Sequence, residues 1–359
     1  MNGFSGSYDP QDVTFLLTRI ALVPTPVAEK ERMLQSGERH YSEMIGVEAP
    51  PDAAYLELYE AALDRNGRRL AQDVAVLARA LAGSHPGGVT LLSLARAGTP
   101  IGVLLRRALA HLGVPVAHYA ISIIRGRGID ERALDHVRRN HAPSTWVFVD
   151  GWTGKGAISA ELRASVGAYA ERCGEPIPST LAVVADLAGT ADLAASNDDY
   201  LIPSSILNAV VSGLVSRTIL PKDHRADQAF HRCVSYEALA PYDLSRCFVD
   251  QLTPAVFVAL GPAGPPTTGA GARERAEVFL HGVMRRWGVT DPNRVKPGIG
   301  EATRALLRRV PDRLVLGDPG ASDVRHLELL AARSGVEVET DSEMPYRACA
   351  LIRQMGGGE

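Results

Sequence analysis

The chain has 359 residues, of which 46% are hydrophobic and 22% are charged, with a formal net charge of −3 and a pI near 6.4. This length favours two domains over one. The near-neutral charge excludes a global attraction to nucleic acid or anionic membrane, although it is compatible with a local basic patch. The four cysteines show no CxxC spacing, which indicates neither a zinc site nor a disulfide framework.

The N-terminal stretch MNGFSGSYDP lacks a basic segment followed by an apolar run, and the sequence contains no stretch of 18 apolar residues. We therefore expect a cytoplasmic protein. The first 52 residues are irregular and polar, which predicts an N-terminal cover made of short helices rather than part of a core.

Apolar strands and amphipathic helices then alternate along the chain. Strands are predicted at 88–95, 115–123, 145–149 and 179–189, and helices at 52–82, 100–113, 131–140 and 156–174. This alternation predicts an α/β fold with right-handed crossovers and a mainly parallel sheet.

A Gly- and Pro-rich stretch, GPAGPPTTGAGA, predicts a linker at 261–272. It separates a first α/β domain at 53–260 from a smaller unit at 273–359, which again alternates helix and strand.

The stretch TWVFVDGWTGKGAIS, at 145–159, predicts a strand, one acid, a Gly-rich loop and the start of a helix. Glycines at 151, 154 and 156 let backbone N–H groups turn toward a ligand at the helix N-terminus, so a phosphate is the expected occupant, with Thr153 adding a hydroxyl donor. Asp150 would face sugar hydroxyls or a metal instead. The spacing is not that of a Walker A loop. The alternative is a plain connection between strand and helix.

A second loop, SLARAGTPIG, also leaves a predicted strand and enters a helix. Arg96 and the Ala97-Gly98 pair lie where a second anion would meet backbone amides, so the two loops together indicate a bisphosphorylated ligand. The alternative for Arg96 is an ordinary solvated surface arginine.

These two loops resemble the phosphoribosyl pyrophosphate (PRPP) motif and the pyrophosphate loop of type I phosphoribosyltransferases. Over nearly its full length the chain also resembles a bacterial family from tellurite-resistance and stress gene clusters, some of whose members carry a cysteine protease (StiP) label. The stretches that carry this second resemblance are SGSYDPQDVTFLL, QSGERHYSEMIG and YLIPSSILNAVVSGLVSRTI.

The resemblance implies a PRPP-dependent phosphoribosyltransferase acting on a base-like acceptor, in either direction, with Mg²⁺ bound alongside PRPP. It implies that Asp150 binds the ribose hydroxyls. If any side chain of the protein binds the Mg²⁺ directly, the resemblance implies that it is Asp150. The 5′-phosphate would bind Thr153, Gly154, Lys155, Gly156 and Ala157, and the pyrophosphate Arg96, Ala97 and Gly98. Residues 123–130 would form a mobile flap that brings Arg125 and Arg127 over the leaving group.

Polar residues between 197 and 208 could read a base-like ring, namely Asn197, Asp198, Tyr200, Ser204, Ser205 and Asn208. The alternative is a turn followed by a helix, with Ser204 or Ser205 as N-cap.

A cysteine protease would need a thiolate beside a histidine, and the nearest pair in the sequence is His231 with Cys233, with His224 close by. Because no catalytic signature surrounds them, a structural role for Cys233 is favoured. His40 and His118 are likewise expected to be packing or hydrogen-bonded residues.

Residues 296–339 resemble the Pelota-like RNA-binding fold, whose helix opens with Gly-x-Asn-Glu-x-x-Lys. Gly298, Glu301 and Arg304 match that pattern, whereas Gly300 replaces the Asn. RNA is therefore an expected partner, with phosphate contacts from Arg304, Arg308, Arg309 and Arg313. The alternatives are a solvated basic helix face and, for the whole chain, a non-catalytic PRPP or nucleotide sensor. A homodimer is compatible with either interpretation.

Overall fold

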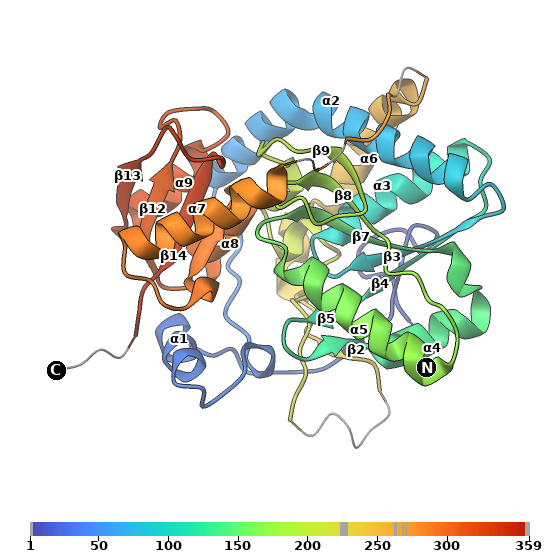
Figure 1. The fold of residues 1–359 in the computed structure, drawn as a ribbon, viewed down its shortest axis with the longest axis horizontal. Coiled ribbons are helices and arrows are strands. Elements are labelled where there is room, and N and C mark those ends of the chain that lie inside the picture. Colours follow the sequence, from blue (N-terminus) through green and yellow to red (C-terminus); the bar gives the residue numbers. More distant parts are fainter. Residues whose placement is uncertain (1–2, 223–228, 262–263, 268, 270, 356–359) are drawn as a thin grey trace.

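A computed structural model of the chain describes residues 3–222, 229–261, 264–267, 269 and 271–355 (Figure 1). Its centre is a six-stranded sheet in which every neighbouring pair is parallel, in the order β1-β4-β3-β7-β8-β9. The strands are β1 (Thr14–Phe15), β3 (Val89–Leu94), β4 (Val116–Ile121), β7 (Trp146–Thr153), β8 (Leu181–Asp186) and β9 (Leu193–Ser196). The predicted α/β class with a parallel sheet is confirmed.

Helices cover both faces of this sheet, as parallel sheets require. One face packs on α2 (Ala53–Ser84) and α3 (Gly98–His111), and the other on α4 (Glu131–Asn140) and α5 (Ala157–Cys173). The helix α6 (Ser245–Ala259) packs on α2 and α3. The strands β3 and β8 are buried along their whole length, because neither face of the sheet meets water. The predicted helix at 52–82 is a single helix, which Asp52 caps by accepting the Tyr55 N–H.

The N-terminal residues form the predicted short helices and, in addition, two strands that the sequence did not predict. The strand β1 extends the central sheet, and β2 (Thr18–Arg19) pairs with β10 (Arg232–Cys233). The segment then forms α1 (Val27–Gln35) and the short 3₁₀ helix η1 (Tyr41–Glu43). The hairpin of β5 (Ile123–Ile124) and β6 (Gly128–Ile129) lies nearby. Further 3₁₀ turns are η2 (Pro143–Thr145), η3 (Pro203–Ser205), η4 (Ala209–Val211) and η6 (Glu237–Tyr242).

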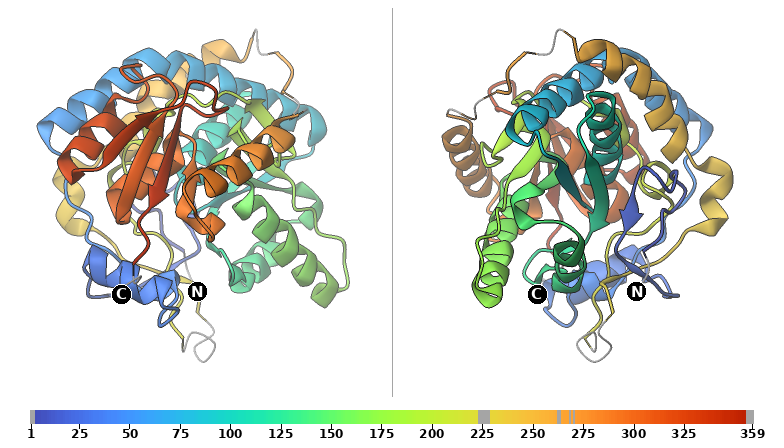
Figure 2. Two further views of the ribbon diagram at one scale, coloured as in Figure 1. Left: turned by 60° about the vertical axis from the view of Figure 1, so that its left-hand side comes forward. Right: turned by 90° about the vertical axis from the view of Figure 1, so that its right-hand side faces the viewer.

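The C-terminal domain has its own four-stranded sheet, in the order β11-β14-β12-β13 (Figure 2). Its elements are α7 (Ala272–Arg286), η7 (Pro292–Arg294), β11 (Val295–Pro297), α8 (Ile299–Arg308), β12 (Pro311–Leu316), α9 (Arg325–Ser334), β13 (Glu337–Thr340) and β14 (Ala348–Ile352). Ion pairs join it to α2, between Arg65 and Asp323 at 3.2 Å and between Arg333 and Asp52 at 2.8 Å. Among the described helices, none is long and apolar enough to cross a membrane.

Candidate functional site

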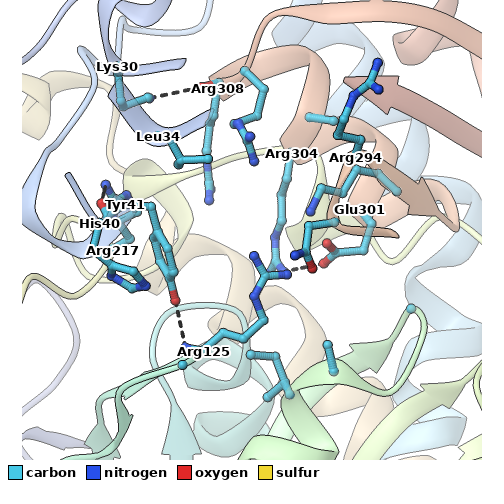
Figure 3. A pocket seen from close by; sticks show the side chains of 18 of the residues that line it. Lys30, Leu34, His40, Tyr41, Arg125, Arg217, Arg294, Glu301, Arg304 and Arg308 are labelled. Atoms are coloured by element: carbon cyan, nitrogen blue, oxygen red, sulfur yellow. Dashed lines mark hydrogen bonds and ion pairs between the residues drawn. The ribbon is translucent and has the colours of Figure 1, made fainter. Parts of the chain in front are cut away.

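A cleft of about 1010 Å³ lies between the carboxyl edge of the central sheet, the N-terminal segment and the C-terminal domain (Figure 3). Its walls come from α1 and η1, the β5-β6 hairpin, the loop between β7 and α5, and the β11-α8 region. About twice as many lysines and arginines as aspartates and glutamates line it. The local basic patch that the composition allowed is therefore inside this cleft.

The loop between β7 and α5 presents its backbone to the cleft. The N–H groups of Gly154, Lys155, Gly156 and Ala157 donate to no acceptor within the described residues. Gly156 has φ +79° at the N-cap of α5, a conformation that favours glycine. Free N–H groups at the start of a helix are an arrangement that favours anions in general, because the helix dipole places partial positive charge there, and α5 has 17 residues.

The sequence predicted that the strand ends just before Asp150. In the structure Asp150 lies inside the strand, because β7 continues through Gly151 and Trp152 to Thr153. Asp150 is half-buried, lines the cleft and accepts the Gly151 N–H at 2.8 Å. Burial raises the pKa of its carboxyl to about 6, although Arg304 acts in the opposite direction.

Thr153 is placed differently from the prediction. Its hydroxyl donates to Asp186 Oδ1 at 2.5 Å and accepts the Ala188 N–H at 3.0 Å. The hydroxyl proton is therefore used inside the sheet domain, where it fixes the loop to the end of β8, and Thr153 offers no hydroxyl donor to a ligand.

Lys155 joins the loop to the C-terminal domain, since its ammonium donates to the carbonyl oxygens of Pro292 and, at 3.1 Å, of Val295. Burial, together with the nearby Arg125, lowers its pKa to about 8. The neighbouring Lys296 has a pKa lowered to about 7, chiefly by burial, and its ammonium makes no hydrogen bond or ion pair in the part of the chain described here.

Of the residues predicted to bind RNA, Glu301, Arg304, Arg308 and Arg309 line the same cleft, whereas Gly298 and Arg313 do not. Arg304 lies over the Trp152 ring, 4.3 Å from its centroid, and donates to Glu301 at 2.9 Å. Gly298 is the N-cap of α8 and packs on the first domain near Leu187. Of the other predicted arginines, Arg308 donates to Asn208, Arg309 pairs with Glu31 at 2.6 Å, and Arg313 pairs with Glu339.

Arg96 is not a surface residue, because its guanidinium is buried against Glu48 at 2.7 Å and donates to the Val215 carbonyl at 2.9 Å. The Glu48 carboxylate, from the N-terminal segment, thus pairs with the Arg96 guanidinium that was expected to bind an anion. Ala97 and Gly98 begin α3, and Gly98 packs so closely on the Val149 carbonyl that a side chain has no room there.

The β5-β6 hairpin, which lies within the predicted flap, contacts α5 and the N-terminal segment. Glu161 accepts the N–H groups of Gly126 and Gly128 at 2.7 and 2.9 Å, and Arg127 pairs with Glu43. The Arg125 side chain extends into the cleft beside Tyr41, whose hydroxyl accepts the Arg125 N–H at 2.8 Å (Figure 3).

The six residues predicted to bind an acceptor are divided between two places. Ser204, Ser205 and Asn208 line a smaller cavity of about 140 Å³, which also borders Asp150, Trp152 and the arginines at 96, 217, 304 and 308. The other three point elsewhere: Tyr200 donates to Asp73, Asp198 pairs with Arg69, and Asn197 donates to Thr267. The two serines lie within η3 and are not N-caps.

The histidines and cysteines fit the structural roles expected of them. His118 is buried between Ser93 and the Asp12 carbonyl, and burial lowers its pKa to about 4. His231 bonds to Ser122, Cys233 is fully buried, and His224 lies outside the described residues. His40 caps η1 at the rim of the cleft. The described residues include no cluster of three or more His, Cys, Asp or Glu suited to a metal ion.

Sequence reasoning missed Glu48, Arg217 and Lys296. Arg217 donates to the carbonyl oxygens of Tyr41 and Met44 and lines both cavities. None of the three belongs to a local motif, because each enters the site through contacts between segments far apart in the chain.

Comparisons with known proteins give the family. Residues 6–253 match the family model described as tellurite-like stress resistance cysteine protease StiP, and residues 274–354 match the PELOTA RNA binding domain. A protein of Acinetobacter baylyi named cysteine protease StiP is 43% identical, over 99% of this chain and 96% of its own.

Similarity to solved structures is weak. A hypoxanthine phosphoribosyltransferase K68R mutant from Trypanosoma cruzi, complexed with IMP, is 14% identical, with a TM-score of 0.28 over 48% of this chain and 87% of its own. An alanine mutant of an invariant aspartic acid in HPRTs is 14% identical, with a TM-score of 0.29 over 48% of this chain and 92% of its own.

These findings correct the expected activity. The expectation of PRPP-dependent phosphoribosyl transfer is wrong, because the relative that is 43% identical over nearly the whole chain is named a cysteine protease, as is the matching family model. The alternative of a PRPP or nucleotide sensor fits them no better. The relative carries the name of an enzyme, and the resemblance to the StiP-labelled family is confirmed. The chain belongs to the family of tellurite-like stress resistance cysteine proteases StiP, with a C-terminal Pelota RNA-binding domain.

Proposed function

We propose that this chain is an enzyme whose active site is the cleft, and that the loop between β7 and α5 binds a phosphate-bearing substrate there. The observation that carries this proposal is the set of four backbone N–H groups, from Gly154 to Ala157, that have no acceptor within the described residues. Donors left without partners in a partly enclosed cleft are costly, and a phosphate oxygen satisfies several at once.

The charges around the loop support an anionic substrate. Lys155, Lys296, Arg125 and Arg304 come from separate elements and line one cleft. Cations brought together this way repel one another, so an anion bound between them lowers the free energy of the folded protein.

Asp150 is the residue that we assign to proton transfer. A carboxyl group whose pKa is about 6 exchanges protons readily near neutral pH, and it lines the same cleft as the loop. In this proposal Mg²⁺ would enter the cleft only with the substrate, as the counter-ion of its phosphate. Asp150 of β7 is the carboxylate that would then bind it.

Isothermal titration of the full chain with inorganic phosphate tests the proposal. We expect one phosphate per chain at this site and about tenfold weaker binding after Lys155→Ala, since a hydrogen bond to a charged group contributes about 1.5 kcal/mol. Arg163→Ala is the matched control, because Arg163 is exposed on α5, the helix that follows the loop, pairs with Asp192 and lies outside the cleft. Failure to bind phosphate, or equal losses in both variants, contradicts the proposal.

Proteolysis is a second candidate, and the name of the 43% identical relative is what favours it. No cysteine of the described chain lines the cleft. Burial raises the pKa of the Cys233 and Cys349 thiols to about 12, so neither is a thiolate at neutral pH. Cys247, on α6, is the exposed thiol.

Cleavage of fluorescein-labelled casein decides between the candidates. Under the first proposal the chain releases no fluorescence, and iodoacetamide modifies Cys247 in the folded protein much faster than Cys233 or Cys349. Casein cleavage that Cys247→Ser or Cys233→Ser abolishes, with unchanged unfolding temperature, would replace the first proposal with proteolysis.

A further inference from the structure

We propose that the substrate of the cleft is single-stranded RNA, and that a phosphorylated RNA end enters the cleft and binds the loop between β7 and α5. This inference rests on the proposed function, because it names the class of molecule that carries the phosphate.

The cations of the RNA-binding domain point into the cleft. Residues 274–354 match an RNA-binding domain, and its basic residues at 294, 296, 304, 308 and 309 line the cleft wall. Lys296 and Arg308 have no ion pair with any carboxylate of the described chain, and Arg308 is half-buried. Charges left without carboxylate partners are available to phosphates.

Several cations on other faces of this domain are already neutralised by its own acids. Arg273 pairs with Glu277 at 3.1 Å and Arg286 with Asp341 at 3.1 Å, while Arg313 pairs with Glu339. An RNA bound at those places would compete with existing ion pairs. On the cleft face Arg304 and Arg309 are also paired with acids, whereas Lys296 and Arg308 have no carboxylate partner among the described residues.

The position of the loop explains why an RNA end, rather than an internal segment, is expected. The two domains touch at the loop: the Tyr346 hydroxyl donates to the Gly154 carbonyl at 3.2 Å, and Lys155 reaches the Val295 carbonyl. A β-carbon on Gly154 would lie 3.2 Å from the Pro297 carbonyl. Because the chain closes the cleft beside these N–H groups, a strand that reaches them must present a terminus.

The cleft also offers surfaces for bases. His40 and Tyr41 lie with ring centroids 4.5 Å apart on the wall opposite the C-terminal domain, and Arg217 lies 5.4 Å from the Tyr41 ring (Figure 3). Aromatic rings and guanidinium planes beside a cationic groove are the usual platform for unpaired bases. A cleft of about 1010 Å³ is also far larger than a single phosphate requires.

Unpartnered donors support a ligand larger than phosphate. Trp152 Nε1, Ser205 Oγ, Arg217 Nη1 and Arg308 Nε are buried and make no hydrogen bond within the described residues. All four residues border the smaller cavity, which shares Asp150, Trp152 and three arginines with the cleft. Acceptors of a nucleotide, in its base, ribose and phosphate, would satisfy such donors.

Fluorescence anisotropy with a ten-nucleotide single-stranded RNA tests the inference on the full chain. The RNA carries a phosphate or a hydroxyl at one end and the dye at the other, in both polarities, and DNA of the same sequence is the comparison. In one of the two polarities, we expect the RNA with a terminal phosphate to bind about tenfold tighter than the same RNA with a terminal hydroxyl at physiological salt. We expect Lys155→Ala to remove that difference.

Variants of the C-terminal domain locate the RNA. Lys296→Gln and Arg308→Gln are each expected to weaken binding of both RNAs. Lys296 has no partner to lose, so its variant tests the inference even where Arg308→Gln fails to fold. Arg325→Ala is the matched control, because Arg325 is exposed on α9 outside the cleft.

Equal affinity for phosphorylated and hydroxyl ends, equal affinity for DNA, or a loss in Arg325→Ala without one in Lys296→Gln overturns the inference. If inorganic phosphate still binds in a Lys155-dependent way, the proposed function survives that failure. If inorganic phosphate does not bind at all, the proposed function itself has failed.

Discussion

Asp199 of the sheet domain accepts the backbone N–H of Ile299, the first residue of α8, at 3.0 Å, and the Arg347 N–H at 2.8 Å. One buried carboxylate therefore caps a helix of the other domain and holds that domain over the cleft. We expect Asp199→Ala to lower the free energy of unfolding by about 2 kcal/mol, because it leaves a helix N-terminus uncapped and two N–H groups unpaired. Urea unfolding measures this loss, and phosphate titration should show weaker binding as the cations of α8 become less ordered.

Asp198→Ala is the control for this prediction. Asp198 is the preceding carboxylate and pairs with Arg69 and Arg347 at the surface, where such pairs contribute about 0 to 1 kcal/mol. A similar loss of stability in both variants would show that the cap does not hold the domains together.

Gly300 lies where a β-carbon would overlap the indole ring of Trp152. This contact explains why glycine stands at the position of the Asn in the RNA-binding pattern: α8 packs there on β7. We expect Gly300→Ala to cost about 1 to 3 kcal/mol and to displace Arg304 from the Trp152 ring. Thermal unfolding and tryptophan fluorescence measure the two effects.

Gly282→Ala is the matched control in the same domain. Gly282 is inside α7, and a β-carbon added there would meet no atom of another element within 4 Å, so alanine should stabilise the helix by about 0.5 to 1 kcal/mol. Opposite signs for the two substitutions are the expected result, and a neutral Gly300→Ala would contradict the packing argument.

The main elements of the fold could be predicted from local patterns. Strand 145–149 and helix 156–174 follow from a continuous apolar run and from helical spacing that ends at Gly174, and both are present as β7 and α5. The strand β1 was missed because it is two residues long and pairs with β4, more than a hundred residues later. The extension of β7 was missed because Gly151 suggested a turn, whereas β8 pairs with β7 through Thr153.

Only part of the site could be predicted from the sequence. Its loops are recognised from short sequence motifs, whereas the residues that contact them lie far away in the chain. The stretch VDGWTGKG predicted a loop between a strand and a helix, and that loop lines the cleft. Nothing near Arg96 indicated that Glu48 would neutralise it, and nothing near Arg304 indicated that α8 would face the loop instead of solvent. These pairings depend on how the N-terminal segment and the C-terminal domain pack on the sheet.

Stability should depend on pH through Asp150. Its pKa is raised by burial to about 6, so the folded state holds the proton more tightly than the unfolded state, and stability falls as the pH rises from about 4 through 6. We expect Asp150→Asn to raise the free energy of unfolding by roughly 2 kcal/mol at pH 8 and by little at pH 4. Urea unfolding at both values measures the difference. Asp64→Asn, an exposed position on α2, controls for the change in net charge, and a gain at pH 8 no larger than in this control would contradict the prediction.

Thr153 couples the loop between β7 and α5 to β8 through its hydroxyl, which bridges Asp186 and the Ala188 N–H. Thr153→Val keeps the shape of the side chain but removes one of the hydrogen bonds that Asp186 Oδ1 accepts, the other coming from the Thr190 N–H, and leaves the Ala188 N–H without its acceptor. This should cost about 1 to 3 kcal/mol. Because the loop then loses its attachment to the sheet, binding of inorganic phosphate should weaken as well. Thr153→Ser retains the hydroxyl and should bind phosphate as the parent does, as measured by the same titration. Weakened binding in Thr153→Ser with unchanged binding in Thr153→Val would mean that the methyl group, and not the hydroxyl, positions the loop.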